Sequence, residues 1–346
     1  MGRFSRFCAW IIGLVLLAAG LLKLMDPVGA GLVMAEYFKF LKVPFLIPAS
    51  EALGVVSAFF EAVLGIAVVC GVWRRVVAVV CGAVLLLFTG ITFLLWLKNP
   101  AMDCGCFGEI VHLTHARSLL KNLALDLLWV VAYVPFSRLG GAGAVKYVGF
   151  GLSCATTLVF AVWSQFTLPA VDFTSMSPGV ELAGAFGLDR AEEDAPVLSF
   201  CDSASVYADS LALSGKVMVV SIYSPDKFGA PDWQKAATIA KGARAAGFTP
   251  LVIVSAASLP GSVADEDIYY GDRRMLMTLN RSNGGVTYIC DGQIICKWTF
   301  RSAPDAVLMR QIYNEDVTDF MARDRTVFEI GIQLVFLFVL ALLLLL

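Results

Sequence analysis

The sequence has little charge and only two histidines. Asp, Glu, Lys and Arg make up 16% of its 346 residues, whereas about 25% is usual in a soluble globular chain. The 26 basic and 28 acidic residues leave a net charge of −2, so the basic excess that a nucleic-acid partner requires is missing. Nine cysteines are present, but they are too scattered to staple a small disulfide-rich domain. The composition therefore argues against a nucleic-acid-binding protein and against a disulfide-held miniprotein.

Long apolar runs take the place of the missing charges. Apolar residues make up 58% of the chain, and its mean hydropathy is +0.77. A helix of about 20 mostly apolar residues is needed to cross a hydrocarbon core about 30 Å thick. Because the first apolar run is too long for a signal peptide and no cleavage site follows it, we expect it to remain as a helix. Six transmembrane segments are predicted, roughly residues 7–25, 50–73, 76–97, 119–136, 147–166 and 327–346.

The distribution of Lys and Arg predicts the orientation in the membrane. Since cytoplasmic loops carry an excess of positive charge, the side with more Lys and Arg is assigned to the cytoplasm. The N-terminus is then cytoplasmic, and residues 26–49, 98–117 and 167–326 lie outside. The prediction is a multi-pass protein of a bacterial inner membrane with a periplasmic soluble domain. The residues that carry the bias are Arg3, Arg6, Arg74, Arg75, Arg138 and Lys146.

The loop between the third and fourth predicted spans contains the sequence Asp103-Cys-Gly-Cys-Phe-Gly108. Gly105 lets the backbone turn, and two cysteines on either side of a turn can approach the Cα separation of about 4.4–6.8 Å that a disulfide needs. So small a ring is strained, and strained disulfides are the labile, more oxidising ones. We therefore predict that Cys104 and Cys106 form a redox-active catalytic pair. Asp103 beside them opposes thiolate formation, whereas a protonated histidine nearby would favour it.

Two other interpretations of this loop remain open. His112 and His115 follow the cysteines and could complete a zinc or copper site with Cys104 and Cys106. The spacing of the two cysteines is shorter than the Cys-x2–4-Cys of common zinc sites. Alternatively, the loop is an inert structural turn.

Four ionisable residues fall within or near the predicted spans. Glu61 and Asp126 lie about halfway along the second and fourth spans, whereas Lys23 and Lys121 lie nearer the outer face. Ionisable residues at membrane depth are costly and are candidates for functional sites. Because Glu61 and Asp126 are at similar depth, we predict that they face each other, either as a proton path beneath the cysteines or as part of a structural ion pair. Each lysine can reach outward or pair with a carboxylate.

Four short motifs together resemble the DoxX family of membrane proteins. They are Gly20-x-x-Lys23-x-x-Asp26-Pro27, Glu61-x-x-x-Gly65, Asp103-Cys-Gly-Cys-Phe-Gly108 and Arg117…Asn122. Within that family the pattern is most similar to the MauE branch, over roughly residues 7–136. The resemblance implies a four-helix membrane bundle similar to that of quinone-linked disulfide-forming enzymes, with quinone as cofactor. It also implies a role in disulfide formation in an exported partner.

The sequence thus divides into four regions. Residues 1–142 are predicted to form the DoxX-like bundle, 143–168 a fifth transmembrane helix, 169–325 a soluble domain and 326–346 a C-terminal transmembrane helix. In the soluble region, predicted strands alternate with helices, which is typical of an α/β domain.

The soluble domain resembles the thioredoxin or redoxin fold. The stretches Leu213–Tyr223 and Gly285–Ile294 carry this resemblance. The catalytic elements of that family are missing, because residues 223–229 contain no Cys-x-x-Cys and Val286 stands where the family has its cis-proline. The resemblance therefore implies a degenerate redoxin domain, used for binding or covering rather than for thiol exchange.

Two further cysteines lie in a predicted β-hairpin of this domain. The Asp-Gly pair at 291–292 is a strong signal for a two-residue hairpin turn. In that register Cys290 pairs with Gln293 and Cys296 with Thr287, which places the two cysteines on opposite faces of the hairpin. We therefore expect no disulfide between them.

Two functions follow from these features. The first is an enzyme, a membrane-bound thiol oxidoreductase in which Cys104 and Cys106 pass electrons from an exported thiol substrate to a membrane acceptor, expected to be quinone. The second is a membrane-anchored binding or assembly factor, whose degenerate redoxin domain docks an exported partner while the cysteine pair is structural or metal-bound. Both place the protein in a lipid bilayer.

Overall fold

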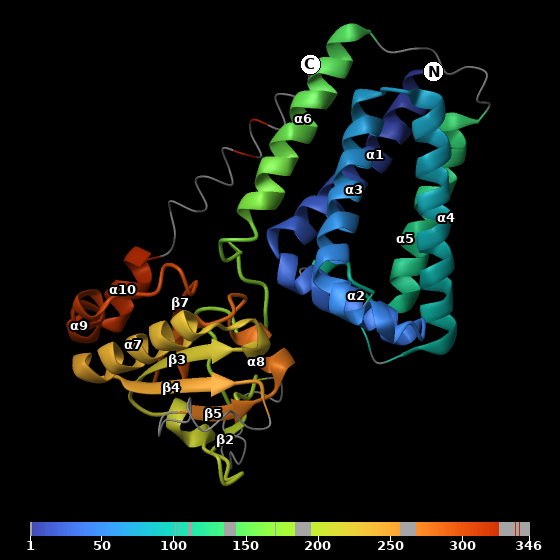
Figure 1. Ribbon diagram of the computed structural model, residues 1–346. Helices are drawn as coiled ribbons and strands as arrows, with labels where there is room; N and C mark the ends of the chain where they lie inside the picture. Colours follow the sequence, from blue (N-terminus) through green and yellow to red (C-terminus); the bar gives the residue numbers. More distant parts are fainter. Residues whose placement is uncertain are drawn as a thin grey trace. The chain divides into compact units, whose positions relative to one another are not determined.

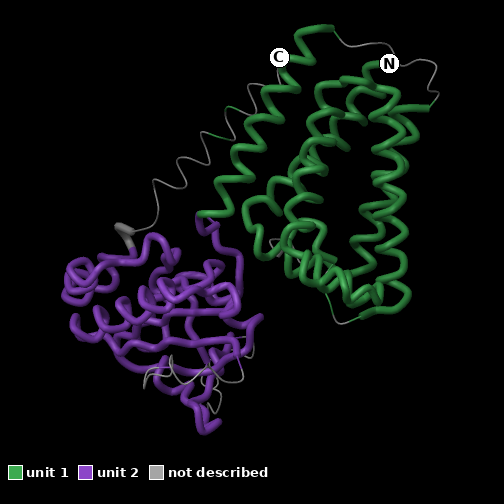
Figure 2. Tube along the Cα trace, viewed as in Figure 1, with its two compact units in different colours: residues 1–166, 331–346 green, residues 167–330 purple. Residues whose placement is uncertain are grey.

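The chain folds into two compact units in the computed structural model. The structure describes residues 2–100, 102, 104–109, 113–134, 143–169, 171–183, 195–256, 268–324, 336 and 339. One unit is made of residues 1–166 and 331–346, and the other of residues 167–330 (Figure 2). The first unit thus combines the predicted bundle with the fifth and the C-terminal predicted spans. The second corresponds to the predicted soluble domain.

The first unit is helical. Its elements are α1 (Arg3–Met25), α2 (Pro27–Phe40), a 3-10 turn (Pro44–Ala49), α3 (Ser50–Cys70), α4 (Arg74–Lys98), β1 (Cys106–Glu109), α5 (His115–Tyr133) and α6 (Ala144–Trp163) (Figure 1). Four segments of the described chain are long and apolar enough to cross a membrane, namely Arg3–Met25, Pro44–Cys70, Arg74–Lys98 and Ala144–Trp163. They correspond to the first, second, third and fifth predicted spans.

Of the C-terminal predicted span, the structure describes only two residues. One of them, Phe336, stacks on Phe160 of α6 with 4.5 Å between the ring centroids. The remainder of this prediction lies outside the described residues.

The fourth predicted span is a helix, α5, but it is not among the four segments that are apolar enough to cross a membrane. It nevertheless packs against α1 and α4 within the first unit. Two of its polar side chains serve this packing: Asn122 donates from Nδ2 to Thr92 Oγ1 on α4 at 3.1 Å, and Trp129 donates from Nε1 to the carbonyl oxygen of Ala78 at 2.8 Å. Polar contacts between helices thus help to hold α5 in the bundle, although its composition falls short of that of a membrane span.

Glycines let α1 and α3 come into backbone contact. A Cβ atom on Gly20 would lie 2.5 Å from the backbone nitrogen of Ala62, and one on Gly65 would lie 2.5 Å from that of Leu17. No side chain fits in these places, so only glycine permits this separation of the two helices. Close approach through small residues is a common way for membrane helices to pack, because lipid tails offer no hydrophobic driving force between them.

The second unit is built on a six-stranded mixed sheet with the strand order β2-β5-β4-β3-β6-β7. In the centre, β3 pairs parallel with β4 and antiparallel with β6; at the edges, β5 pairs parallel with β4, β7 antiparallel with β6, and β2 antiparallel with β5. Helix α7 packs on β3 and β4, and α9 packs on α7. The strands are β2 (Phe200–Cys201), β3 (Lys216–Ile222), β4 (Thr249–Val254), β5 (Ile268–Gly271), β6 (Gly285–Cys290) and β7 (Gln293–Trp298). The helices are α7 (Ala230–Ala246), α8 (Arg273–Leu279), α9 (Ala306–Asn314) and α10 (Val317–Asp324) (Figure 1).

The hairpin of β6 and β7 turns at residues 291–292 as predicted, but its pairing differs beyond the turn. Cys290 pairs with Gln293, whereas Cys296 pairs with Tyr288 rather than with the predicted Thr287, because a bulge intervenes. One extra residue on a strand reverses the alternation of its side chains. Both cysteines therefore lie on one face of the hairpin, and both pack against the same apolar core. The prediction of opposite faces was wrong, although both are free thiols.

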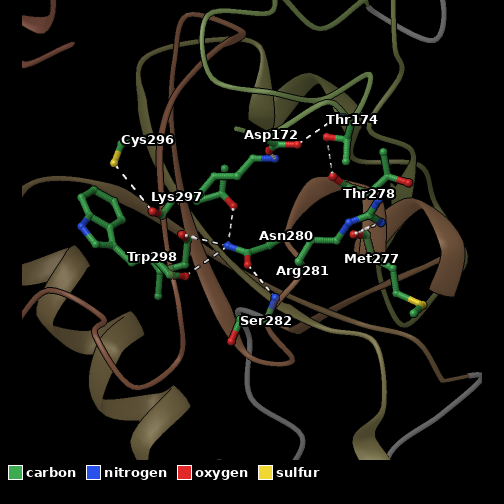
Figure 3. A network of polar contacts seen from close by, with 12 residues as sticks. Asp172, Thr174, Met277, Thr278, Asn280, Arg281, Ser282, Cys296, Lys297 and Trp298 are labelled. Atoms are coloured by element: carbon green, nitrogen blue, oxygen red, sulfur yellow. Dashed lines mark hydrogen bonds and ion pairs between the residues drawn. The ribbon is translucent and has the colours of Figure 1, made fainter. Parts of the chain in front are cut away.

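A buried polar network ties the first residues of the second unit to this hairpin and to α8 (Figure 3). Asn280, which follows α8, donates to the carbonyl oxygens of Val286 and Trp298, each at 3.2 Å. Asp172 forms an ion pair of 2.6 Å with Lys297, whose side chain is only 6% exposed. Burial alone would raise the pKa of Asp172, but the charge and hydrogen bond of Lys297 together with the hydrogen bonds of Thr174 outweigh it, so the pKa is lowered and the pair stays ionised.

Candidate functional site

The two cysteines of the predicted redox pair are in contact. Cys104 and Cys106 lie between α4 and α5, and their sulfur atoms are 2.7 Å apart as free thiols. Gly105 between them has a φ of +58°, which favours glycine, and a Cβ atom there would clash with Val33 of α2. The prediction that glycine allows the two cysteines to meet is confirmed. Asp103, which was expected to oppose thiolate formation, lies outside the described residues.

The two thiols differ in their surroundings. Cys104 is buried, at 2% exposed, and the hydroxyl of Tyr37 on α2 donates to its carbonyl oxygen. Burial raises the pKa of Tyr37, so this hydroxyl stays protonated and remains a donor. Cys106 is partly exposed and begins the short strand β1. Lys121 of α5 lies with its ammonium nitrogen 4.8 Å from the centroid of the Phe107 ring, which follows Cys106 directly.

These surroundings favour a thiolate at Cys104. The hydrogen bond from Cys106 lowers the pKa of Cys104 most, burial opposes it, and Ser118 and the charge of Lys121 lower it further, to about 6. The same hydrogen bond raises the pKa of Cys106, because Cys106 is the donor that keeps its proton. Cys104 is therefore the more acidic thiol of this coupled pair.

An apolar cavity of about 350 Å³ begins at this pair of cysteines. Residues from α1 to α5 line it, and Cys104, Gly105 and Cys106 form part of its wall. The few polar groups around it include Lys23, Glu61, Lys121 and Asn122. A mostly apolar cavity with a small number of convergent polar groups is the usual form of a small-molecule site.

The intramembrane carboxylates have different partners. Lys23 of α1 donates to both carboxylate oxygens of Glu61 on α3, at 2.7 and 2.8 Å. Asp126 of α5 instead accepts a hydrogen bond of 2.7 Å from Thr89 on α4. The prediction that Glu61 and Asp126 face each other was wrong, because equal depth in a membrane does not fix which neighbouring helix a side chain faces. The other expectation, that a lysine pairs with a carboxylate, is confirmed for Lys23.

The described residues do not provide a set of ligands for the predicted metal site. Among them there is no group of three or more His, Cys, Asp or Glu side chains that could hold a metal ion. His115 lies at the start of α5, and its Nε2 is 3.1 Å from the carbonyl oxygen of Pro100. His112 lies outside the described residues.

Two residues of the site have no counterpart in the predictions from sequence. Tyr37 lies on α2, in the loop region between the first two predicted spans, and no motif singles it out. Ser118 lies three residues before Lys121 on α5, so a helix over this segment places both side chains on one face. That spacing could have drawn attention to Ser118.

We expect the Lys23–Glu61 ion pair to contribute to the free energy of unfolding. Both side chains are mostly buried, at 14% and 6% exposed, so Lys23→Met or Glu61→Gln alone should lower the free energy of unfolding by about 3–5 kcal/mol. The double variant should lose less than the sum, because neither residue then leaves an unpaired partner. Denaturant unfolding of the purified chain in detergent measures this.

The control for this prediction is a second double variant. Glu61→Gln combined with Asp126→Asn should show additive losses, because these carboxylates have different partners. Coupling between Glu61 and Asp126, with none between Glu61 and Lys23, would contradict the arrangement.

Comparison with known proteins gives one relationship. No curated protein and no solved structure matches this chain significantly. A family model does match, that of methylamine utilisation protein MauE, and the match covers residues 1–136. This confirms the resemblance predicted for roughly residues 7–136. The helices α1 to α5 and the loop with both cysteines are therefore similar to the MauE family of membrane proteins.

Proposed function

We propose that this protein is a membrane-bound thiol oxidoreductase that passes electrons from an exported thiol substrate to quinone. The observation that carries the proposal is the position of Cys104 and Cys106 in the wall of an apolar cavity enclosed by membrane helices. A redox pair placed in this way can meet a lipid-soluble acceptor without leaving the protein. The overall reaction balances, because two substrate thiols give one disulfide, two electrons and two protons, and one quinone takes up both to become a quinol.

The cavity fits the chemistry of a quinone head group. Its volume of about 350 Å³ and its apolar lining suit a substituted ring, and the aromatic side chains of Phe38, Phe60 and Phe88 line it. Lys121 and Asn122 also line it and offer N–H donors for a ring carbonyl oxygen. The quinone would accept electrons there, while the residues of the chain bind it, orient it and exclude water.

The Lys23–Glu61 pair gives the cavity a polar group beside the thiols. Oxidation of a dithiol releases protons, and quinone reduction takes protons up. An ion pair that lines the same cavity as both cysteines supports a role in passing these protons or in fixing the ring. We assign the pair to this site.

The strand order of the second unit supports the proposal that it is a redoxin-like domain used for docking. Four neighbouring strands of its sheet follow the order β4-β3-β6-β7. Strand β3 is parallel to β4 and antiparallel to β6, and β6 is antiparallel to β7, which is the arrangement of a thioredoxin core. No cysteine follows β3, and Ser224 stands there instead. Its backbone N–H and C=O both bond to the side chain of Asn283, at 3.0 Å each. This segment is thus held by structural hydrogen bonds, which suits a domain that binds an exported partner without exchanging thiols.

The first prediction concerns the two cysteines. With dithiothreitol as electron donor and ubiquinone-1 as acceptor, the purified chain should reduce the quinone, followed by the loss of oxidised quinone absorbance. Cys104→Ser/Cys106→Ser should bring the rate to the uncatalysed level, whereas Cys201→Ser in the second unit should leave it unchanged. Full activity in the double variant would refute the proposal. Stoichiometric zinc that is lost with either cysteine would favour a metal site instead.

The second prediction concerns the cavity. Ser57 lines it, and its hydroxyl donates within α3, to the carbonyl oxygen of Gly54 at 2.9 Å. Ser57→Phe should therefore fill part of the cavity and raise KM for ubiquinone-1, while the rate at which dithiothreitol reduces the Cys104–Cys106 disulfide stays unchanged. Val56→Phe is the matched control, because Val56 is the neighbouring residue on α3, is 62% exposed and does not line the cavity. Equal effects of both variants on KM would place the quinone elsewhere.

The third prediction concerns topology. We propose a bacterial inner-membrane protein with a cytoplasmic N-terminus and a periplasmic second unit, on the basis of the Arg and Lys distribution. A cysteine introduced at the exposed Gln234 should react with a membrane-impermeant maleimide in intact cells, whereas one at Gly2 should react only after lysis. Peptide mass spectrometry separates these products from the native cysteines. The reverse pattern would invert the topology.

A further inference from the structure

The two sulfurs of the pair lie in unequal surroundings, and we propose that this gives them fixed roles. Cys106 exchanges with the exported thiol substrate, Cys104 passes the electrons to the quinone, and Ser118 is a positioning residue that holds Cys104 as the leaving thiolate. This assignment rests on the proposed function and adds to it which sulfur does what.

The first observation is the difference in exposure. Cys104 is 2% exposed and its carbonyl oxygen is held by Tyr37, whereas Cys106 is partly exposed. An incoming substrate thiolate must reach the sulfur that it attacks, so the more exposed Cys106 is the accessible target. Cys104 is then the sulfur expelled by that attack.

The second observation is the surroundings of the expelled sulfur. The side chain of Ser118 is fully buried, and its hydroxyl makes no hydrogen bond of ordinary geometry within the described part of the chain. It lies close enough to the Cys104 sulfur to lower the pKa of that thiol. A buried hydroxyl without a partner is unfavourable, and donating to a thiolate would satisfy it. Ser118 thus stabilises the state in which Cys104 carries negative charge.

The third observation is the charge on the same helix. Lys121 follows Ser118 by three residues on α5 and lies over the Phe107 ring. Its charge lowers the pKa of Cys104 and opposes the rise at Cys106. A thiol of lower pKa is the better leaving group in disulfide exchange. The charge of Lys121 acts on both thiols, and the exposure and the Ser118 hydroxyl assign the leaving role to Cys104.

The reaction consists of two thiol exchanges followed by reduction of the quinone. The substrate thiolate attacks Cys106 Sγ, the Cys104–Cys106 bond breaks, and Cys104 leaves as a thiolate. A second substrate thiolate attacks the substrate sulfur of the mixed disulfide, which releases a substrate disulfide and leaves Cys106 reduced. The reduced pair then gives two electrons to the quinone, the two protons that the substrate thiols released complete the quinol, and the Cys104–Cys106 disulfide forms again.

The first test identifies the attacked sulfur. The oxidised full chain is mixed with reduced glutathione as probe, quenched with acid, and analysed by fragmentation mass spectrometry. Glutathione should be found on Cys106. Glutathione on Cys104 would overturn the assignment while leaving thiol exchange intact, and no adduct on either sulfur would overturn both the assignment and the proposed function.

The second test measures the effect of Ser118 on Cys104. In the reduced chain, the alkylation rate of Cys104 by iodoacetamide is followed against pH by peptide mass spectrometry. Ser118→Ala should raise the pKa of Cys104 by about one unit, which slows alkylation about tenfold at roughly pH 5, and Ser118→Thr should restore it. The matched control is Ser153→Ala on α6, because Ser153 is also fully buried with an unpartnered hydroxyl. Ser153→Ala should leave the profile unchanged.

Neither the glutathione test nor the alkylation test needs quinone. A Cys106 adduct and a shifted profile in a chain that does not reduce ubiquinone-1 would keep the assignment and refute the acceptor. Identical profiles for Ser118→Ala and the wild type, or a shift of the same size in Ser153→Ala, would overturn the role of Ser118.

Discussion

Backbone contact between α1 and α3 is the constraint on which the rest of the site depends. Gly20 lies directly against Ala62, the residue after Glu61, so Lys23, one helical turn beyond Gly20, comes level with that carboxylate. The ion pair that results also lies beside the cysteine loop, since a Cβ atom added to Gly108 would lie 3.9 Å from the Lys23 side chain. A larger residue at Gly20 or Gly65 would push the helices apart and separate the pair. Two glycines therefore determine where the charged groups of the cavity lie.

Helix α5 shows how the needs of a membrane helix and of a reactive site conflict. Its polar residues keep its hydropathy too low for a membrane span judged by composition. Two of them, Ser118 and Lys121, are the residues that face the thiols, and Asn122 bonds to Thr92 of α4. Each would be unfavourable against lipid, but inside the bundle Asn122 bonds to Thr92, and Ser118 and Lys121 lie near the thiols. The polar residues that lower the hydropathy of α5 are thus the same ones that it contributes to the site.

Polar contacts hold the segment that follows β3, the central strand of the second unit. Ser224 is bonded through its backbone to Asn283 and through its hydroxyl to Arg273, 3.3 Å from Nη2. Asn280 and the Asp172–Lys297 pair fix the neighbouring hairpin in the same way. Buried polar groups that are all satisfied give rigidity and a defined shape.

Much of this arrangement follows from the sequence itself. Apolar runs and their lengths determined five of the helices, because membrane spans and core helices leave a strong local signal. The Cys-Gly-Cys spacing was enough to predict contact between Cys104 and Cys106, since only local backbone geometry is involved. The Asp-Gly turn at 291–292 was fixed in the same local way.

What depends on contacts between distant segments was decided only by the tertiary structure. The partner of Glu61 is set by the rotation of α3 against α1, which rests on atoms at Gly20 and Ala62 and leaves no periodic trace. The face of Cys296 depends on a bulge that one extra residue introduces into β7. The unequal thiols depend on Tyr37 and Ser118, which approach Cys104 from α2 and α5. Sequence determined that two cysteines would meet, whereas only the packing of separate helices around them decided which one has the lower pKa.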